Sequence, residues 1–588
     1  MFLLRLFIFF FLLNIFNTAM SDSVTVSSDK NQSSDTSVQQ NIDTDDVTLT
    51  VSGNAQVDDD AKAVAVDAGV SGAAVIVESG STITTTSLDN GIIADNTTLL
   101  DVTNSGTISA SRHKAIDIYR STNSSITNNS GATISSVGNT IRTGGTSGDP
   151  STGYTITNSG KIFSTSTGTK SSVFFGNENS SGGTIINNSG AEIYSGGNVA
   201  TIRVGGTTTI KNSGSIKNNT SVDDNVIELL GSNNTVTLEE GSILVGKISS
   251  ASGTSGNTLK LDLGAGQGYF YETDGDLILE DLDGNQVVKG SAGSVGQGGS
   301  ETLDELLSYK SMNLRKFFSK YNKLDDEDAW GETYVSNLKR DAHTNNLALE
   351  YDLLNFGVNL INRMENASFV IAFEGGIQDF AKDHKIDYKN ITTGVYLPQK
   401  NNPYLNLDLF ILGGITLKEG ERTILTNTTS NGKLKIDSDY ETYEIYTGIK
   451  RNNLSLVPDF GFTASYSITP NYDETKYFSW KDRHIGNLSI FFSDDYKFFK
   501  NKDSKLSLGW ILDVRDMIGD EKQVYSINGT SATYKQDNDL TNEISLLANV
   551  AYEKIFSRNS TISFSLEAKD TNQYAKSIGA NISLRKKF

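Results

Sequence analysis

The stretch Ile156-Thr157-Asn158-Ser159-Gly160-Lys161-Ile162 decides the fold of the first half of the chain. Apolar residues alternate with polar ones on both sides of an Asn-Ser-Gly centre, a pattern typical of two half-buried strands joined by a tight turn. Asparagine tolerates left-handed backbone and glycine adopts it without strain, so we expect both residues to serve the turn. The stretch therefore predicts a strand–turn–strand unit.

This unit recurs at glycine spacings of 24 to 30 residues, a period typical of repeat architectures. Short apolar clusters between the copies, such as Ala115–Ile118, supply a third strand per repeat. We therefore predict a right-handed parallel β-helix over residues 22–289, in which stacked coils bury Ile and Val. A disordered Ser/Thr-rich stalk is the alternative, and the regular apolar positions argue against it. Only the Ser/Asp/Gln-rich residues 22–50 are expected to be disordered. The other copies are Val102–Ile108, Ile126–Ile134, Ile185–Ile193 and Ile210–Ile216, with looser copies around Gly80 and Gly241.

The N-terminus carries a targeting segment. Arg5 is followed by the apolar run Leu6–Phe16, and Ala19-Met20-Ser21 offers small residues for cleavage before Asp22. A bilayer-spanning helix needs roughly 20 apolar residues, so this run is too short for an anchor. Residues 1–21 are therefore predicted to be a secretory signal peptide. No later stretch reaches spanning-helix length, so any further membrane contact is expected to use strands.

A linker and one polar helix divide the chain. Gly290–Ser300 is rich in Gly and Ser and predicts a flexible linker. Thr302-Leu303-Asp304-Glu305 has the spacing of a capping box, and Lys310, Arg315, Lys316 and Lys320 follow toward the helix end, as the macrodipole favours. A helix over Thr302–Tyr321 would be about 30 Å long, the thickness of a bilayer core. Because it is too polar to face lipid, we expect it to line a water-filled pore.

From Trp330 onward the chain alternates in segments of about ten residues, and we count about twelve of them. Ile562, Phe564 and Leu566, for example, alternate with Ser, Thr and Glu. One apolar and one polar face predict a transmembrane antiparallel β-barrel with lipid outside and water inside. A soluble β-sandwich also alternates, but the signal peptide and the even strand count favour the barrel. Residues 301–588 hold 38 of the 53 aromatic residues and all three Trp, whereas residues 22–300 hold nine aromatics.

This order of parts resembles a Gram-negative autotransporter of the monomeric type V secretion class. The resemblance implies a signal peptide (1–21), a β-helical passenger (22–289), a linker with a pore helix (290–325) and a twelve-stranded outer-membrane barrel (326–588), with the passenger at the cell surface or released. About 290 residues of barrel sequence set the chain apart from trimeric relatives, which carry four strands per chain. The family's barrel assembly signal would lie at Ser577, Gly579, Ile582, Leu584 and Phe588, where Ser577 is smaller than the usual polar residue.

Composition narrows the functional classes. The net charge of −20 argues against a nucleic-acid partner, and the absence of Cys removes thiol nucleophiles and thiolate metal sites. His113 is the single histidine of the passenger and is interpreted as an exposed loop residue. Asp58–Asp60 and the acidic residues between Asp274 and Asp283 lack calcium-loop spacing. We therefore expect no enzyme, no metal and no cofactor.

The passenger repeats are similar to those of self-associating and adhesive passengers. The sequence thus favours an adhesive or self-associating module, with an enzyme passenger or a passive surface coat as alternatives. The expected partners are outer-membrane lipid, the barrel assembly machinery and an unknown surface or cell–cell ligand of the passenger.

Overall fold

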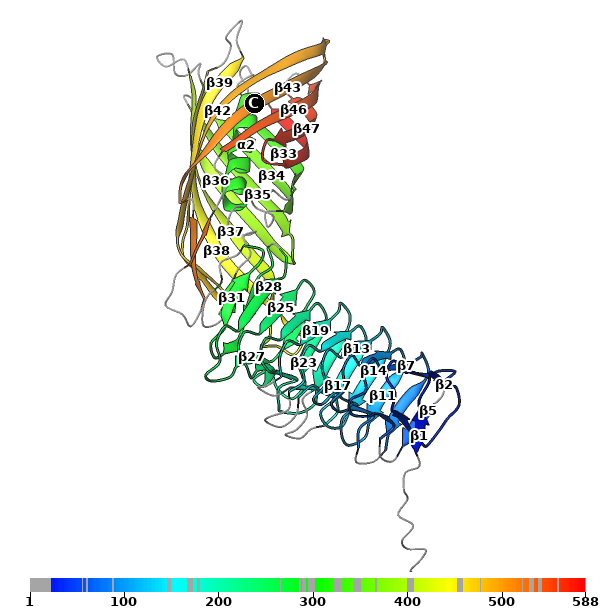
Figure 1. Cartoon of the computed structure of the whole chain (residues 1–588). Coiled ribbons are helices and arrows are strands. Elements are labelled where there is room, and N and C mark those ends of the chain that lie inside the picture. The colour runs from blue at the N-terminus through cyan, green and yellow to red at the C-terminus, as the bar shows by residue number, and fades with distance from the viewer. Residues whose placement is uncertain are drawn as a thin grey trace, which may run out of the picture. The chain divides into compact units, whose positions relative to one another are not determined.

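The computed structural model shows a nearly all-β chain that forms two compact units (Figure 1). One unit comprises Met1–Gly264, Phe270–Gly293 and Leu425–Lys433, and the other comprises Ala265–Tyr269, Ser294–Ile424 and Leu434–Phe588. The structure describes residues 23–586 except for 55, 60–61, 87–88, 145–149, 167–172, 177–179, 265, 285–286, 288–291, 295–301, 322–328, 342–349, 365–366, 399–406, 452–457, 476, 521, 528–533, 538–541 and 558–559. The predicted signal peptide and Phe588, together with most of the predicted linker, lie outside these residues.

The first unit is a parallel β-solenoid with three strands per coil, as the repeats predict. Its described strands form three parallel sheets, here called sheets A, B and C. Sheet A runs β1 (Ser23–Val26), β3 (Gln39–Ile42), β6 (Val64–Val66), β9 (Ile92–Ala94), β12 (Ile116–Asp117), β15 (Ile141–Arg142), β18 (Phe174–Phe175), β21 (Ile202–Val204), β24 (Asn225–Leu229), β27 (Lys247–Ser250) and β30 (Thr273–Asp274). Sheet B runs β2 (Lys30–Gln32), β4 (Thr48–Val51), β7 (Ala74–Val77), β10 (Asp101–Asn104), β13 (Ser125–Asn128), β16 (Thr155–Asn158), β19 (Thr184–Asn187), β22 (Thr209–Asn212), β25 (Thr235–Glu239), β28 (Thr258–Asp262) and β31 (Ile278–Asp281). Sheet C runs β5 (Gln56–Asp59), β8 (Thr82–Thr85), β11 (Thr107–Ala110), β14 (Thr133–Ser136), β17 (Lys161–Ser164), β20 (Glu192–Ser195), β23 (Ser215–Asn218) and β26 (Ile243–Val245).

The core of the solenoid consists of rows of Ile and Val in register. In sheet B, Ile126 pairs with Ile156 and Ile156 with Ile185, and all three are fully buried. Each coil covers the apolar row of its neighbour, so stability accumulates with coil number. The described part of the solenoid begins at β1, so the prediction of disorder for residues 22–50 is wrong: the strands β1 to β3 lie in this range and β4 begins in it. These short strands contribute few apolar side chains. They are ordered because the next coil of the solenoid covers those side chains and completes the core.

The repeated asparagines serve the turns through their side chains and not through left-handed backbone, since Asn158 Oδ1 accepts a hydrogen bond from Gly160 N at 3.1 Å. They keep ordinary strand backbone, point into the solenoid and form a ladder of amide hydrogen bonds at the end of the sheet B strands. Asn128 Nδ2 donates to Asn158 Oδ1 at 2.8 Å, and Asn158 Nδ2 donates to Asn187 Oδ1 at 2.9 Å. Glycine has two roles in these turns. Gly190 has a φ of 78°, whereas at Gly160 a Cβ would lie 2.3 Å from the Ala132 carbonyl oxygen of the preceding coil.

Truncating one rung of this ladder is expected to destabilise the solenoid. Asn158→Ala removes the partner of the Asn128 amide and of the Asn187 carbonyl, and leaving buried polar groups unpaired costs about 1–3 kcal/mol. We expect a lower urea midpoint for solenoid unfolding, followed by circular dichroism of the full chain in detergent. Asn198→Ala, at an exposed site, is the control and should change the free energy of unfolding by less than about 0.5 kcal/mol. Equal midpoints for the two variants would show that the ladder adds no stability.

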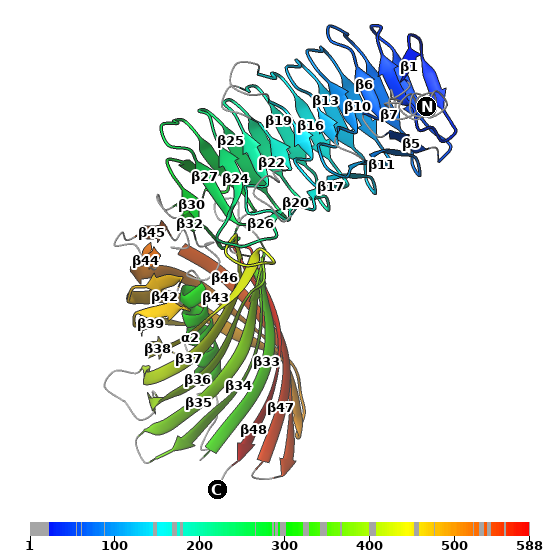
Figure 2. The ribbon, with the colours of Figure 1, turned by 90° about the horizontal axis from the view of Figure 1, so that it is seen from below.

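The second unit contains a closed antiparallel barrel of twelve strands (Figure 2). Sheet order follows chain order from β33 to β37 in one direction and from β48 back to β38 in the other, and the β37–β38 pairing closes the circle. The first and last strands pair in continuous register, from Ala329 with Lys586 to Arg340 with Ala575. The strands are β33 (Ala329–Arg340), β34 (Tyr351–Arg363), β35 (Ser368–Phe380), β36 (His384–Leu397), β37 (Asp408–Thr426), β38 (Lys433–Arg451), β39 (Asp459–Thr469), β42 (Arg483–Lys500), β43 (Ser504–Gly519), β46 (Asn542–Ser557), β47 (Ser560–Thr571) and β48 (Ala575–Lys586).

The barrel has an apolar outer face and a polar inner face, as the period-two pattern predicts. On β48 the side chains of Ile578 and Ile582 are 72% and 54% exposed, while Ser577 and Asn581 are buried inside. Outward apolar side chains need lipid around them, and closure leaves no strand edge unpaired in that lipid. Within the described residues, no helix combines the length and the apolar character needed to cross a membrane.

The polar helix α2 (Thr302–Tyr321) lies in the barrel lumen, enclosed by the strands (Figure 2). Its side chains from Leu306 to Phe318 are all buried, because the barrel wall surrounds the helix. A small separate sheet, also in this part of the chain, is formed by segments between the long strands. It consists of β40 (Tyr472–Glu474), β41 (Phe478–Trp480), β44 (Lys522–Ile527) and β45 (Tyr534–Asp537), and two further short strands are β29 (Tyr269–Tyr271) and β32 (Ala292–Ser294).

Candidate functional site: the helix-filled barrel lumen

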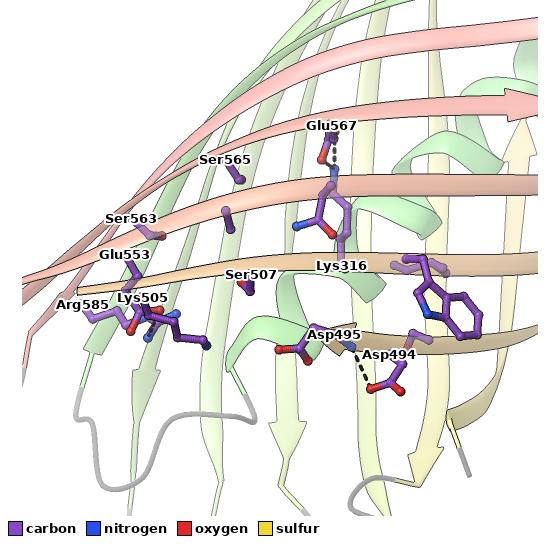
Figure 3. Close-up of a pocket in the computed structure, with 16 residues that line it drawn as sticks. Lys316, Asp494, Asp495, Lys505, Ser507, Glu553, Ser563, Ser565, Glu567 and Arg585 are labelled. Atoms are coloured by element: carbon purple, nitrogen blue, oxygen red, sulfur yellow. Dashed lines mark hydrogen bonds and ion pairs between the residues drawn. The ribbon is translucent and has the colours of Figure 1, made fainter. Parts of the chain in front are cut away.

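Three cations of α2 form buried ion pairs with the barrel wall. Lys310 Nζ lies 2.9 Å from Glu444 Oε1 on β38 and donates to Thr416 Oγ1 at 2.6 Å. Arg315 Nη2 lies 2.8 Å from Asp513 Oδ2 on β43. Lys316 Nζ lies 2.6 Å from Glu567 Oε1 on β47 (Figure 3). Each buried charge is therefore neutralised and hydrogen-bonded, which such a location requires.

The spacing of these cations along the helix explains why they reach three different strands. At 3.6 residues per turn, Lys310, Arg315 and Lys316 project in directions separated by about 140°, 100° and 120°. The helix is thus held from three sides of the lumen. The sequence places the cations toward the helix end, where the macrodipole favours them, but their larger role is to pair with the wall.

Aromatic packing holds the C-terminal half of the helix. Phe317 stacks on Trp330 with ring centroids 4.3 Å apart, and Phe318 stacks on Tyr396 at 4.8 Å and Phe410 at 4.7 Å. These rings belong to one buried cluster that joins α2 to several strands. The aromatic packing and the ion pairs therefore hold the helix at the same position. The helix plugs the lumen there.

The wall carries further polar groups that pair without the helix. Glu543 accepts from two cations of neighbouring strands, since Arg515 Nη2 and Lys569 Nζ each lie 3.2 Å from its oxygens. Glu374 accepts hydrogen bonds from the hydroxyls of Tyr334 and Tyr388. This inward polar network stiffens the wall and gives the lumen the polarity of an aqueous passage.

A cavity of about 160 Å³ remains beside the helix (Figure 3). It is lined by charged and small polar side chains of β42, β43, β46, β47 and β48, together with Lys316. Glu553 and Arg585 form an ion pair across 3.3 Å at this cavity. Its size suits a few water molecules beside the helix.

The structure places most of the predicted assembly-signal residues on β48. Ile582 and Leu584 are each 54% exposed on the outer face, whereas Ser577 and Gly579 face the lumen, and Phe588 lies outside the described residues. A Cβ at Gly579 would lie 2.8 Å from Glu567 Oε1, so the glycine leaves room for the carboxylate that holds Lys316. In the solenoid, His113 is exposed, as expected for a loop residue.

Sequence reasoning missed the wall carboxylates Glu444, Asp513 and Glu567. Their positions in the sequence did indicate that they face the lumen, because each lies at an inward-facing position of a strand in which apolar and polar residues alternate. That position marks a residue as facing the lumen but does not show which helix side chain it meets.

No family model and no curated protein matches the chain. Among solved structures it is similar to the translocator domain of the autotransporter NalP from Neisseria meningitidis, at 9% identity and a TM-score of 0.34, over 48% of this chain and 98% of that chain. It is similar to the transport unit of the autotransporter AIDA-I from Escherichia coli at 10% identity and a TM-score of 0.28, over 44% and 90%. The toluene transporter TbuX from Ralstonia pickettii matches at 10% identity and a TM-score of 0.29, over 45% and 91%.

The class of the protein follows from its own architecture. A parallel β-solenoid, a helix in the lumen and a closed twelve-stranded barrel with an apolar outer face are its described parts, and such a barrel is the architecture of proteins that cross a membrane with strands.

Proposed function

We propose that the passenger is an adhesive or self-associating module that its own barrel displays on the cell surface. The observation that carries this proposal is the continuous, regularly stacked solenoid with outward rows of short polar side chains. In sheet B, Thr103, Thr127 and Thr157 occupy successive positions of one such row. Such a rigid and repetitive surface suits many weak contacts made side by side, which together give avidity.

The proposal is of a binding passenger rather than an enzyme that works through a cysteine or histidine. Catalysis by nucleophile and base needs groups held in mutual hydrogen-bond reach. The chain has no Cys, and His113, the one histidine before the barrel, is exposed in a solenoid loop. An enzyme of another type and a passive coat are the competing functions, and the experiment below distinguishes them.

The test compares cells that express the full chain with cells that express a chain lacking residues 22–289. Adhesive function predicts that the full chain increases attachment to host-cell or matrix-coated surfaces, or settling of cell suspensions, and that the deletion abolishes the increase. Antibody against the barrel confirms equal amounts in the outer membrane. Equal attachment and settling of both strains would identify a coat, and hydrolase activity of the full chain would favour an enzyme.

We also propose that the end of β48 is recognised by the barrel assembly machinery before the barrel closes. An unpaired terminal strand is available for recognition until it pairs with β33, which it does along its whole length in the finished barrel. Deletion of Phe588 is therefore expected to reduce outer-membrane insertion several-fold, measured by fractionation and heat-modifiable gel mobility. Deletion of an exposed hairpin residue, Asn431, is the control. Normal insertion without Phe588 would remove its sorting role.

A further inference from the structure

Sheet C ends earlier than the other two sheets of the solenoid. Among the described strands it stops at β26, whereas sheets A and B continue to β30 and β31. Ile243 N donates to Gly214 O of the preceding coil, so the N–H and C=O groups of the next residue, Leu244, point to the opposite edge of β26. No described strand follows β26 in sheet C at that edge. A strand edge with unpaired backbone groups invites pairing with other strands, so folded proteins cover it.

A segment from far along the chain covers this edge. Residues Leu425–Lys433, here called the hairpin tip, connect β37 to β38 in the chain but belong to the solenoid unit. Gly432 lies directly against β26. A Cβ at Gly432 would come within 2.7 Å of Ile243 Cγ2 and 3.4 Å of the Leu244 carbonyl oxygen. The hairpin tip therefore lies where the next strand of sheet C would be expected.

Asn427 joins the hairpin tip to two successive coils. Gly246 N donates to the backbone oxygen of Asn427 at 3.0 Å, and Asn427 Nδ2 donates to Gly246 O at 2.9 Å. Asn427 Nδ2 also donates to Glu272 O at 2.8 Å, and Glu272 N donates to Asn427 Oδ1 at 2.8 Å. Gly246 and Glu272 directly precede β27 and β30, which pair with each other. The Asn427 amide, 1% exposed, thus uses both its donors and its acceptor on backbone groups of neighbouring coils.

The hairpin tip is built to hold Asn427 in this position. Thr426 N donates to Gly432 O at 3.0 Å, and Thr428 N donates to Thr426 Oγ1 at 3.2 Å, so short-range hydrogen bonds flank Asn427 on both sides. Gly432 has a φ of 71°, which glycine adopts without strain. A turn that is ordered by its own hydrogen bonds loses little entropy when it packs against the solenoid.

We propose that the hairpin tip is the end cap of the solenoid. It takes the place of a further sheet C strand, holds the last coils together through Asn427 and closes the edge of β26 against strands of other molecules. Stacked repeats need a cap because a terminal repeat lacks a neighbour on one face. The cap lies 181 residues after Gly246 in the chain, so the end of the solenoid is complete only when the hairpin between β37 and β38 is present.

Hydrogen exchange of the full chain in detergent, followed by mass spectrometry, tests the cap. Asn427→Ala leaves buried backbone groups of Gly246 and Glu272 without partners, so peptides covering residues 243–250 and 269–274 are expected to exchange about tenfold faster. Coils from β4 to β10 and the barrel strands should exchange at unchanged rates. Ser430→Ala, at an exposed site of the same hairpin tip, is the matched control and should stay within about twofold.

A second variant keeps the test independent of side-chain size. Asn427→Asp preserves the shape of the side chain but places a carboxylate oxygen against the Gly246 and Glu272 carbonyl oxygens, so it should match or exceed the effect of Asn427→Ala. Heat-modifiable gel mobility confirms that the barrel has formed in each variant. If the alanine variant does not form a barrel, the aspartate variant decides the test.

Limited trypsin digestion gives a separate readout, because Lys247 and Lys260 lie in the last coils. Both Asn427 variants should be cut there several-fold faster than the unmodified chain and Ser430→Ala. Equal exchange and equal cleavage in all variants would show that the hairpin tip is not a cap. Faster exchange spread evenly over every coil would also overturn the proposal, because a cap acts at the end of the solenoid.

Discussion

Lys316→Glu is expected to unplug the barrel and make it conduct ions. The new carboxylate would face Glu567 across the 2.6 Å that now separates an ion pair, deep in the lumen. Breaking a buried pair costs about 3–5 kcal/mol, and here repulsion between two buried like charges is added. The helix is expected to leave its seat, because Lys310 and Arg315 then hold it from only two sides. Single-channel recordings in planar bilayers should show large, frequent openings that the unmodified chain lacks.

The double variant Lys316→Glu with Glu567→Lys provides the internal check. It restores opposite charges at the same two places, so conductance should return toward that of the unmodified chain. Lys435→Glu is the matched control, because its pair with Glu421 is exposed and such pairs contribute about 0–1 kcal/mol. It should leave the barrel closed. Equal conductance of Lys316→Glu and Lys435→Glu would show that the buried pairs do not seat the helix.

Ile582→Lys is expected to destabilise the barrel more than Ser583→Lys. Ile582 is exposed on the outer face of β48, and a lysine there must enter lipid at a cost of roughly 2–4 kcal/mol near the midplane. Ser583 is 3% exposed and faces the lumen beside the cavity that Arg585 and Glu553 line, so a lysine there stays among polar groups. Urea titration of the refolded full chain in liposomes measures the difference.

A third position on β48 tests how the loss of stability depends on the distance from the end of the strand. Leu584 lies two residues closer to the end of β48, where a long cation can extend toward the headgroups. Leu584→Lys should therefore fall between the other two variants in stability. If all three lysine variants unfold at the same urea concentration, the outward and inward faces of β48 have been assigned wrongly.

Local periodicity explains how much of this fold could be predicted. A spacing of 24 to 30 residues between glycines and a period of two in Ile562–Leu566 are visible in any short window. The same short stretches of sequence gave a wrong or incomplete prediction where one residue type has two structural roles. Asn158 was expected to serve a turn, which its side chain does by accepting from Gly160 N, but it also ends a strand and joins a ladder whose neighbours are 29 and 30 residues away. Its role depends on the coils on either side.

The sequence by itself determined the solenoid, the polar helix of bilayer length and the two-faced strands of the barrel, because each depends on the order of neighbouring residues. Only the tertiary structure decided which groups meet in the lumen. Lys310, Arg315 and Lys316 pair with residues 134, 198 and 251 positions further along the chain. Barrel closure sets those pairings, since it fixes which inward side chain of which strand faces each side of the helix. Coil stacking likewise brings Glu228, Ser249 and Asp274 into one row, although nothing in their local sequence links them.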